Sequence, residues 1–234
     1  MLNLNSKILE DIVCDSLDSH LGINDLIHPN QWGFKKGVST ESLLLYLTET
    51  WKKPIDDGYK VGVFFADFKK AFDTVDHATL KTKLSDLGVS GVIHEWIASY
   101  VHERSQYVNV NGARQIAIGV PQGSPLGPRF FAIYVNDLPN SSEIGRIHMF
   151  ADDTTIYYIG KEVEETIDAS NHIFNHFRVW CCKNHLTVHT GKTVAMLISN
   201  HAFVGPLRAS LHDPGLDTDP GQFSVEFFVY MIPG

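Results

Sequence analysis

The chain has 234 residues, of which 44% are hydrophobic and 20% charged, the composition of an ordinary globular protein with one large core or two small ones. No apolar run reaches the roughly 18 residues that a membrane-spanning helix needs, and the acidic, amphipathic N-terminus does not resemble a signal peptide. We therefore expect an intracellular protein that is neither secreted nor bound to a membrane. The formal net charge of −8 argues against an extensive basic surface for nucleic acid, although a centre that binds divalent cations is itself acidic.

The cysteines and histidines carry no metal-binding pattern. Cys14, Cys181 and Cys182 are odd in number and contain no C-x-x-C spacing, so neither a disulfide framework nor a thiolate zinc site is predicted. The twelve histidines are scattered without the spacings of known metal motifs. A reducing compartment fits this usage.

The first quarter of the chain predicts two helices and a strand. Apolar residues at helical spacing favour a helix that Gly22 ends, and they are Ile8, Leu9, Ile12, Val13, Leu17 and Leu21. A second helix is capped by Ser39 and ended by Pro54. Residues 61–66 are a continuous apolar run of strand length, typical of a central strand.

The middle of the chain predicts two more helices, a hairpin and a loop that leads into a helix. Residues 80–100 hold two apolar stripes at helical spacing, the second capped by Ser90. The Asn-Gly pair at 111–112 lies between alternating apolar runs and indicates a β-hairpin. After a stretch rich in Gly and Pro, Ser124 reads as an N-cap with Pro125 at the first helical position.

The last third begins when Pro139 closes that helix. Residues 147–158 are apolar on both sides of Asp152-Asp153 and predict a strand, a tight turn and a strand. A helical stripe over 163–181 follows, and short strands over 186–199 follow that. The alternation of strands and helices indicates a mixed, α+β class of domain. We expect residues 200–234 to be a poorly integrated tail, because its apolar end has no partner segment.

Three carboxylates suggest chemistry by their context. Asp67 follows the apolar strand, where an unpaired charge is costly, and Asp152 and Asp153 repel each other at the tip of an apolar hairpin. Both features become easier to understand if the side chains bind a cation such as Mg²⁺. Taken singly, each has a more common explanation, a strand end and a polar turn. Their occurrence together, with a Gly-rich loop between them, favours the metal interpretation.

Several segments resemble one family of enzymes. Phe65–His77 resembles the first palm motif of reverse transcriptases from non-LTR (LINE-type) retrotransposons, and Gly119–Pro128 resembles their second. Phe150–Asp153 is similar to their aromatic-x-Asp-Asp metal motif. Further likenesses are the fingers-like Gln31–Phe34 with Ser39-Thr40, then Arg104–Gln106, and last Trp180, Asn184, Leu186 and Lys192-Thr193. The likeness covers about residues 28–199 in the family's order.

The resemblance implies a catalytic and metal-binding set. Asp67, Asp152 and Asp153 would hold two Mg²⁺ ions, with Mn²⁺ as the alternative, and the backbone carbonyl of Phe68 would contact the second ion. Lys192 would protonate the leaving pyrophosphate, its alternative being a solvated lysine after a glycine turn.

A nucleotide-binding set is implied as well. Phe72 would exclude a ribose 2′-hydroxyl, its alternative being a core aromatic residue. Gln122, Gly123 and Ser124 would line the pocket for the nucleotide and template base, although a plain loop-to-helix junction would use the same residues. Lys35, or its neighbour, would contact the triphosphate.

Arg104 would pair either with nucleic acid or with a palm carboxylate. The implied fold is α+β, a right-hand polymerase palm over residues 61–199 in which an antiparallel sheet has helices on one face. Partial fingers occupy residues 1–60, and no thumb is expected. The implied function is RNA-directed DNA polymerase acting on an RNA template, a DNA primer and dNTPs, carried by a fragment of a longer protein. The alternative is a catalytically silent relative that serves as an RNA-binding or interaction domain.

Overall fold

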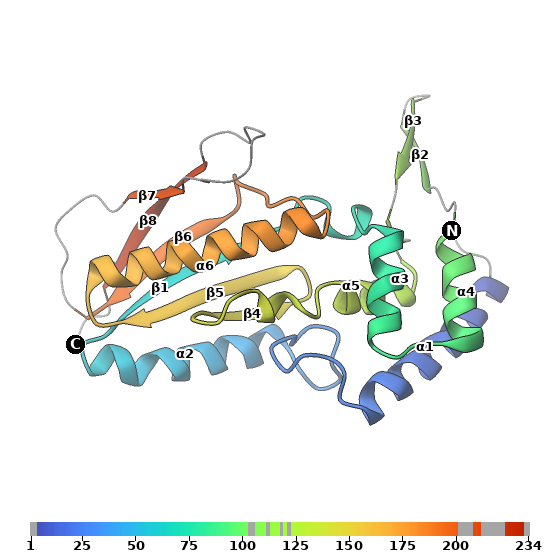
Figure 1. Ribbon diagram of the computed structural model, residues 1–234, viewed down its shortest axis with the longest axis horizontal. Helices are drawn as coiled ribbons and strands as arrows, with labels where there is room; N and C mark the ends of the chain where they lie inside the picture. The colour runs from blue at the N-terminus through green and yellow to red at the C-terminus, as the bar shows by residue number, and fades with distance from the viewer. Residues whose placement is uncertain are drawn as a thin grey trace.

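The computed structural model describes residues 4–102, 106–110, 113–117, 119–120, 123–200, 208–211 and 223–231, and it describes side chains within 7–102, 119–120 and 123–200. Figure 1 shows an elongated molecule with the main sheet at one end and a group of helices at the other. Among the residues that the structure describes, no helix combines the length and apolarity that crossing a bilayer requires.

The main sheet has six strands in the order β4-β5-β1-β6-β8-β7. Their bounds are β1 (Lys60–Ala66), β4 (Arg146–Phe150), β5 (Asp153–Gly160), β6 (Val194–Ser199), β7 (Arg208–Leu211) and β8 (Phe223–Met231). All neighbours are antiparallel except β6 and β8. The predicted central strand is confirmed, since β1 pairs with β5 on one side and β6 on the other.

Helices cover both faces of this sheet. The long helix α6 (Val163–Lys183) lies along one face, where Phe174 stacks on Phe64 of β1 with ring centroids 4.4 Å apart. The helix α2 (Thr40–Asp56) lies along the other face, where Trp51 meets Tyr157 of β5 edge-on at 5.4 Å. Burial of each such ring contributes about 1.5–3 kcal/mol. Helices on one face were predicted for residues 61–199, and the second face is covered by a helix from the preceding segment.

The remaining helices share one core with α6. They are α1 (Leu4–Ile23), α3 (His77–Asp86), α4 (Gly91–Val101) and α5 (Leu126–Tyr134), with the short 3-10 helices η1 (Ala71–Asp73) and η2 (Leu138–Ser141). The strands β2 (Gln106–Val110) and β3 (Ala113–Ala117) form the predicted hairpin, whose turn lies outside the described residues. The α+β class predicted from the sequence is confirmed.

The helix caps follow the sequence in part. The Ser39 side chain accepts a hydrogen bond from the Ser42 N–H, which confirms the predicted N-cap of α2. Pro54 was predicted to end this helix, and that prediction is wrong, because α2 continues to Asp56. Proline in the last turn removes a single helical hydrogen bond, and the buried Ile55 holds that turn on the sheet.

The helix α5 differs from its prediction at both ends. It begins at Leu126 with Pro125 at the N-cap, one residue later than expected, although the Ser124 hydroxyl still accepts a hydrogen bond from the Leu126 N–H at 3.1 Å. The helix ends at Tyr134, so Pro139 falls in η2 and does not close it. Leu138, in η2, is nevertheless buried.

The C-terminal apolar segment has a partner strand, which the sequence did not predict. Residues Ala195–Ser199 of β6 pair in parallel with Phe227–Met231 of β8. The expectation that this segment lacks a partner is therefore wrong. Parallel pairing joins segments that are not linked by a tight turn, and periodicity within one segment carries no information about such a partner.

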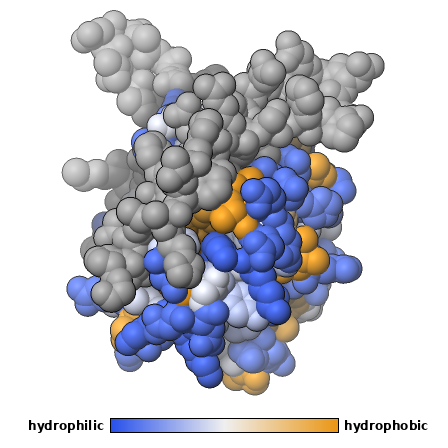
Figure 2. Space-filling view, turned by 90° about the vertical axis from the view of Figure 1, so that its left-hand side faces the viewer, coloured by the Kyte–Doolittle hydropathy of each residue, from blue (hydrophilic) through white to orange (hydrophobic). Residues whose placement is uncertain are grey.

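The end of the molecule where β1 begins and β5 ends is mostly polar. Figure 2 looks onto this end, and hydrophilic residues dominate its described surface, with hydrophobic residues in separate small groups. The residues expected to carry chemistry lie at the other end of the same strands, where β1 ends and β5 begins.

Candidate active site

Asp67 is placed by the end of β1. Side chains alternate along the strand, so Asp67 lies on the face of the buried Val63, the face that α2 covers farther along. Its backbone carbonyl accepts a hydrogen bond from the His189 N–H at 2.7 Å. The loop before β6 therefore holds the end of β1 in place, and the Asp67 side chain keeps 22% of its surface exposed.

The turn that carries Asp152 and Asp153 is held by the fingers-like segment. Ala151 has a left-handed backbone with φ of 58°, uncommon for a residue with a side chain. The buried Gln31 side chain accepts hydrogen bonds from the N–H groups of Ala151, at 3.3 Å, and Gly33, at 2.9 Å. Gly33 itself touches the turn, because a Cβ atom there would lie 2.2 Å from the Ala151 nitrogen.

Strand pairing brings the three carboxylates to one end of the sheet, where β1 ends and β5 begins. In the register of β1 with β5, Ala66 lies opposite Thr154, so Asp67 lies opposite Asp153 one residue farther on. The pKa of Asp153 is raised by its partial burial and by the negative charges of Asp152 and Asp67, although its side chain still reaches solvent. The chain thus assembles a site where adding positive charge relieves repulsion.

Lys192 already contributes such a charge. Its amine lies 3.2 Å from Asp67 Oδ2, and its positive charge lowers the pKa of Asp153. The Lys192 N–H donates to the His189 carbonyl at 3.0 Å in the turn that also clamps Asp67. Two thirds of the Lys192 side chain is exposed, so water screens this ion pair.

The donor set fits a divalent cation, although the carboxylates are not drawn together around one. Asp67 Oδ2 is shielded from solvent and accepts no hydrogen bond within the described structure. Oxygen ligands of this kind are those that Mg²⁺ and Mn²⁺ prefer. Across the described residues no three acidic, histidine or cysteine side chains form a closed metal cluster, so a shared ion would require these side chains to rotate.

Phe68 and Phe72 follow the first motif. The Phe68 side chain is buried, and the antiparallel bridge between Phe68 and Val188 uses the Lys69 N–H and the Asp67 carbonyl, not the Phe68 carbonyl. Phe72 is half-buried, with its ring 4.8 Å from that of Phe131. Its environment is therefore compatible both with a pocket wall and with a core aromatic residue.

The first and second motifs touch each other. The Val120 N–H donates to the Phe72 carbonyl at 2.9 Å, and a Cβ atom on Gly119 would lie 2.3 Å from the same oxygen. Gly123 has φ of 79°, a conformation that favours glycine, and Ser124 is buried. Gln122 and Arg104, for which the sequence implied roles, lie outside the described residues.

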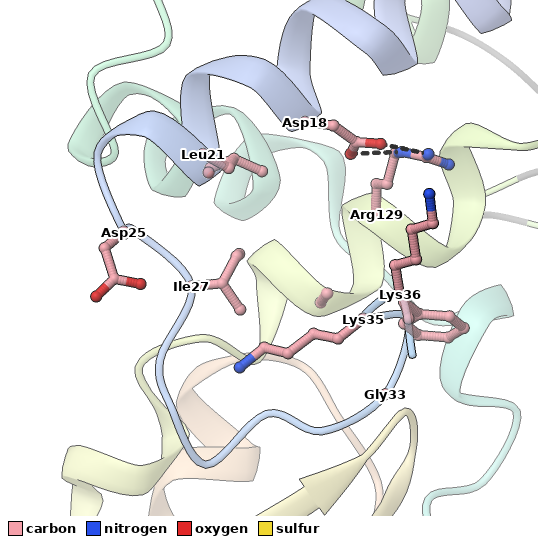
Figure 3. Close-up of a pocket in the computed structure, with 11 residues that line it drawn as sticks. Asp18, Leu21, Asp25, Ile27, Gly33, Lys35, Lys36 and Arg129 are labelled. Carbon is pink, nitrogen blue, oxygen red and sulfur yellow. Dashed lines mark hydrogen bonds and ion pairs between the residues drawn. The ribbon is translucent and has the colours of Figure 1, made fainter. Parts of the chain in front are cut away.

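A cavity of about 790 Å³ lies between α1, the segment around Gly33 and α5. Figure 3 shows Lys35 and Lys36 in this cavity, extending in different directions, with Lys36 toward Arg129. Burial lowers the pKa of Lys35, and its amine donates to the His28 carbonyl at 3.4 Å. In the described structure the Lys35 amine thus contacts the loop backbone at His28, and no contact to the site carboxylates is seen.

Two residues of the site were given no role from the sequence. Gln31 and Gly33 appeared only as part of a fingers-like segment, yet they hold the turn that presents Asp152. No local pattern marks this contact, because Gln31 and its partner Ala151 lie 120 positions apart in the chain. Only the tertiary structure identifies that partner.

Comparison with solved structures identifies the fold. Apo telomerase from Candida tropicalis superimposes with a TM-score of 0.57 at 15% identity, covering 80% of this chain and 36% of that chain. Telomerase from Candida tropicalis in complex with a TWJ fragment of telomeric RNA gives a TM-score of 0.53 at 14% identity, covering 87% and 36%. These likenesses confirm the predicted fold class, a polymerase palm, and at this identity they extend no further than the fold.

Sequence comparison identifies relatives in mobile elements. A probable RNA-directed DNA polymerase from transposon BS of Drosophila melanogaster is 27% identical over 205 residues, and the RNA-directed DNA polymerase from mobile element jockey of Drosophila funebris is 26% identical over 205 residues. Each match covers 83% of this chain and 22% of the relative. The chain thus spans about a fifth of the length of these relatives. They confirm the resemblance to non-LTR retrotransposons.

The family is established by a match along nearly the whole chain. The profile described as "Reverse transcriptase (RNA-dependent DNA polymerase)" matches residues 1–227, which include all three site carboxylates and Lys192. Such enzymes depend on divalent metal ions in general, in keeping with the acidic site. The chain belongs to the reverse transcriptase family.

Proposed function

We propose that this chain is the catalytic core of an RNA-directed DNA polymerase of a non-LTR retrotransposon. It would transfer a deoxynucleotide from a dNTP to the 3′-hydroxyl of a DNA primer on an RNA template. The observation that carries the proposal is the position of Asp67, Asp152 and Asp153 at one end of the sheet, where β1 ends and β5 begins. There the pKa of Asp153 is raised by its partial burial and by its acidic neighbours.

Asp67, Asp152 and Asp153 would hold two Mg²⁺ or Mn²⁺ ions, with the Phe68 carbonyl as a further ligand. When bound, these ions would supply Lewis-acid activation of the attacking hydroxyl and stabilise the leaving pyrophosphate. The protein fixes Asp67 through the backbone contact to His189 and fixes the Asp152 turn through Gln31. A backbone held in this way limits the reorganisation during the reaction to the side chains.

Lys192 is suited to hold a proton beside the leaving group. Its amine lies 3.2 Å from Asp67 Oδ2, so it reaches the space where the phosphates of a dNTP would meet the carboxylates. A lysine that leaves this carboxylate when cations bind can donate its proton to pyrophosphate.

The nucleotide would lie against the contact between the first two motifs. Phe72 would exclude the ribose 2′-hydroxyl, and the loop that contains Gln122, Gly123 and Ser124 would line the base. Lys35 would contact the triphosphate of the nucleotide, and Arg104 would contact nucleic acid. The proposed organisation is partial fingers over 1–60, a palm over 61–199 and a C-terminal segment over 200–234 that adds strands to the sheet.

Primer extension on an RNA template tests the proposal. The chain is incubated with a labelled DNA primer, dNTPs and Mg²⁺ or Mn²⁺, and incorporation is measured for the wild type and for Asp152→Asn. We expect incorporation that the variant lowers by at least about a thousandfold, because the lost carboxylate would hold an ion at the reacting phosphate. Asp168→Asn, which removes an exposed aspartate from α6, is the matched control and should keep full activity.

One observation favours a catalytically silent RNA-binding domain instead. The Lys192 amine occupies the side of Asp67 where a cation would bind. Binding of the RNA without incorporation at any Mg²⁺ or Mn²⁺ concentration would support this second candidate and contradict the first. Use of ribonucleotides in place of dNTPs would contradict the role given to Phe72.

A further inference from the structure

The helix α1 buries a carboxylate that its apolar pattern does not predict. Ile8, Leu9 and Ile12 belong to the predicted stripe, yet more than half of each side chain is exposed. Glu10, between them, has no exposed surface. Burying a carboxylate is costly unless hydrogen bonds replace its hydration, so the partners of Glu10 matter.

Two hydroxyl groups supply those hydrogen bonds. The Tyr100 hydroxyl of α4 donates to Glu10 Oε1 at 2.7 Å, and the Ser124 hydroxyl donates to Glu10 Oε2 at 2.7 Å. Each carboxylate oxygen thus has one donor, and bonds to a charged acceptor are stronger than neutral ones. Three segments distant in sequence meet at this one side chain.

The contact fixes the orientation of Ser124. The Ser124 hydroxyl has a single proton, which it donates in the hydrogen bond to Glu10. The Ser124 oxygen therefore acts as the acceptor for the Leu126 N–H, at 3.1 Å. Ser124 follows Gly123, whose φ of 79° makes this a sharp turn, and it immediately precedes α5. Glu10 therefore sets the direction in which the loop enters the helix.

The same loop is anchored at its other end to the first motif. The Val120 N–H donates to the Phe72 carbonyl at 2.9 Å. Val120 and Ser124 are thus each anchored by a residue from a distant part of the chain, Val120 by Phe72 and Ser124 by Glu10.

We propose that Glu10 is a positioning residue for nucleotide selection, which acts through Ser124 to fix the turn at Gly123 that leads into α5. The proposal rests on the proposed function, in which Gly123 and Ser124 line the nucleotide pocket. Glu10 itself touches neither substrate nor metal. It acts on the affinity for the incoming dNTP rather than on the chemical step.

Glu10→Gln is the informative variant, because it keeps the size of the side chain and replaces one acceptor oxygen with an amide donor. One of the two hydroxyl groups then loses its carboxylate acceptor and is left with the 3.2 Å contact between the Tyr100 and Ser124 hydroxyl groups. In primer extension we expect KM for dNTP to rise about tenfold while kcat changes less than about twofold. Asp11→Asn is the matched control, since it removes the same charge from an exposed position in the same turn, and it should leave both constants unchanged.

A second measurement needs no activity. Hydrogen exchange followed by mass spectrometry should show faster exchange in peptides that span residues 119–128 in Glu10→Gln than in Asp11→Asn, with β1 and α6 unchanged. If the wild type incorporates no dNTP, the proposed function fails, and this exchange measurement still decides whether Glu10 orders the loop.

Ser124→Ala breaks the same contact from the other partner and covers the case in which Glu10→Gln does not fold. Because the two residues act through one contact, the double variant should raise KM no further than the more severe single variant. Equal KM values for Glu10→Gln and Asp11→Asn would overturn the proposal. Faster exchange throughout the chain would also overturn it, because that result indicates general destabilisation.

Discussion

Lys192 and Asp67 form an ion pair at the centre of the site, and this pair has consequences for cation binding. The amine lies 3.2 Å from an oxygen that is shielded from water and has no hydrogen bond within the described structure. A divalent cation on the same oxygen must displace the amine. The lysine would therefore compete with a cation for this oxygen.

Replacement of Lys192 by Met should tighten cation binding while it slows nucleotide addition. Removal of an exposed competing charge is worth about a two- to fivefold gain in Mn²⁺ affinity, since solvent screens the pair. Calorimetric titration with Mn²⁺ measures this without substrate, and primer extension measures the loss of rate. Lys161→Met, at an exposed position just beyond the end of β5, serves as the control. Weaker Mn²⁺ binding to Lys192→Met than to the control would contradict the competition.

At the scale of elements, the sequence predicted most helices and strands but not what each one touches. The apolar run of β1 and the Ser39 cap of α2 are local signals, and both predictions are confirmed. The burial of Glu10 and the pairing of β8 with β6 depend on partners from distant segments. Periodicity shows which side of an element is apolar, and it does not show which residue from elsewhere arrives there.

The candidate site likewise contains residues that the sequence identifies and residues that only the tertiary structure identifies. Asp67, Asp152 and Asp153 stand out because a carboxylate is unexpected beside apolar strands, and the register of β1 and β5 brings them together. Gln31 and Gly33 could not be selected, since glutamine and glycine are ordinary in a loop. Their importance appears only in their contact with Ala151.

Gly33→Ala should lower activity strongly, although it adds only one methyl group. The new Cβ would lie 2.2 Å from the Ala151 backbone nitrogen, so the turn that carries Asp152 must shift. We expect at least about a hundredfold loss of kcat/KM, because small displacements of catalytic groups are costly. Gly22→Ala is the matched control, since a Cβ there meets no atom within 4 Å. Equal activity of the two variants in primer extension would show that the turn tolerates displacement.

For the molecule as a whole, acid stability depends on a buried histidine on the α2 face of the sheet. His148 is buried, and its Nδ1 accepts a hydrogen bond from the Trp32 indole N–H at 3.2 Å. Burial, with smaller contributions from His28 and Arg146, lowers the pKa of His148 to about 4. The neutral form is therefore the form that the folded protein accommodates.

The lowered pKa of His148 predicts how the stability of the folded protein changes with pH. In the unfolded chain the group protonates near its ordinary value of about 6.5, whereas in the folded chain it protonates near 4, so the unfolded state binds more protons between these values. Stability should fall as the pH drops from about 6.5 toward 4. His148→Gln should reduce that fall, measured by urea unfolding at several pH values. His94→Gln, at the partly buried position 94 in α4, is the comparison. An identical pH dependence in His148→Gln and wild type would contradict this account.

The fingers-like segment is joined to the sheet by more than side chains. The Trp32 N–H donates to the Met149 carbonyl at 2.8 Å, and the Met149 N–H donates to the Asn30 carbonyl at 2.9 Å, so this segment lies along β4 like a short extra strand. These backbone links join the segment to β4 directly before the turn that carries Asp152. If binding of a triphosphate displaced residues 30–33, the turn that carries Asp152 would move with them, because Gln31 holds that turn. Arrival of the nucleotide and alignment of the carboxylates would then be a single mechanical event.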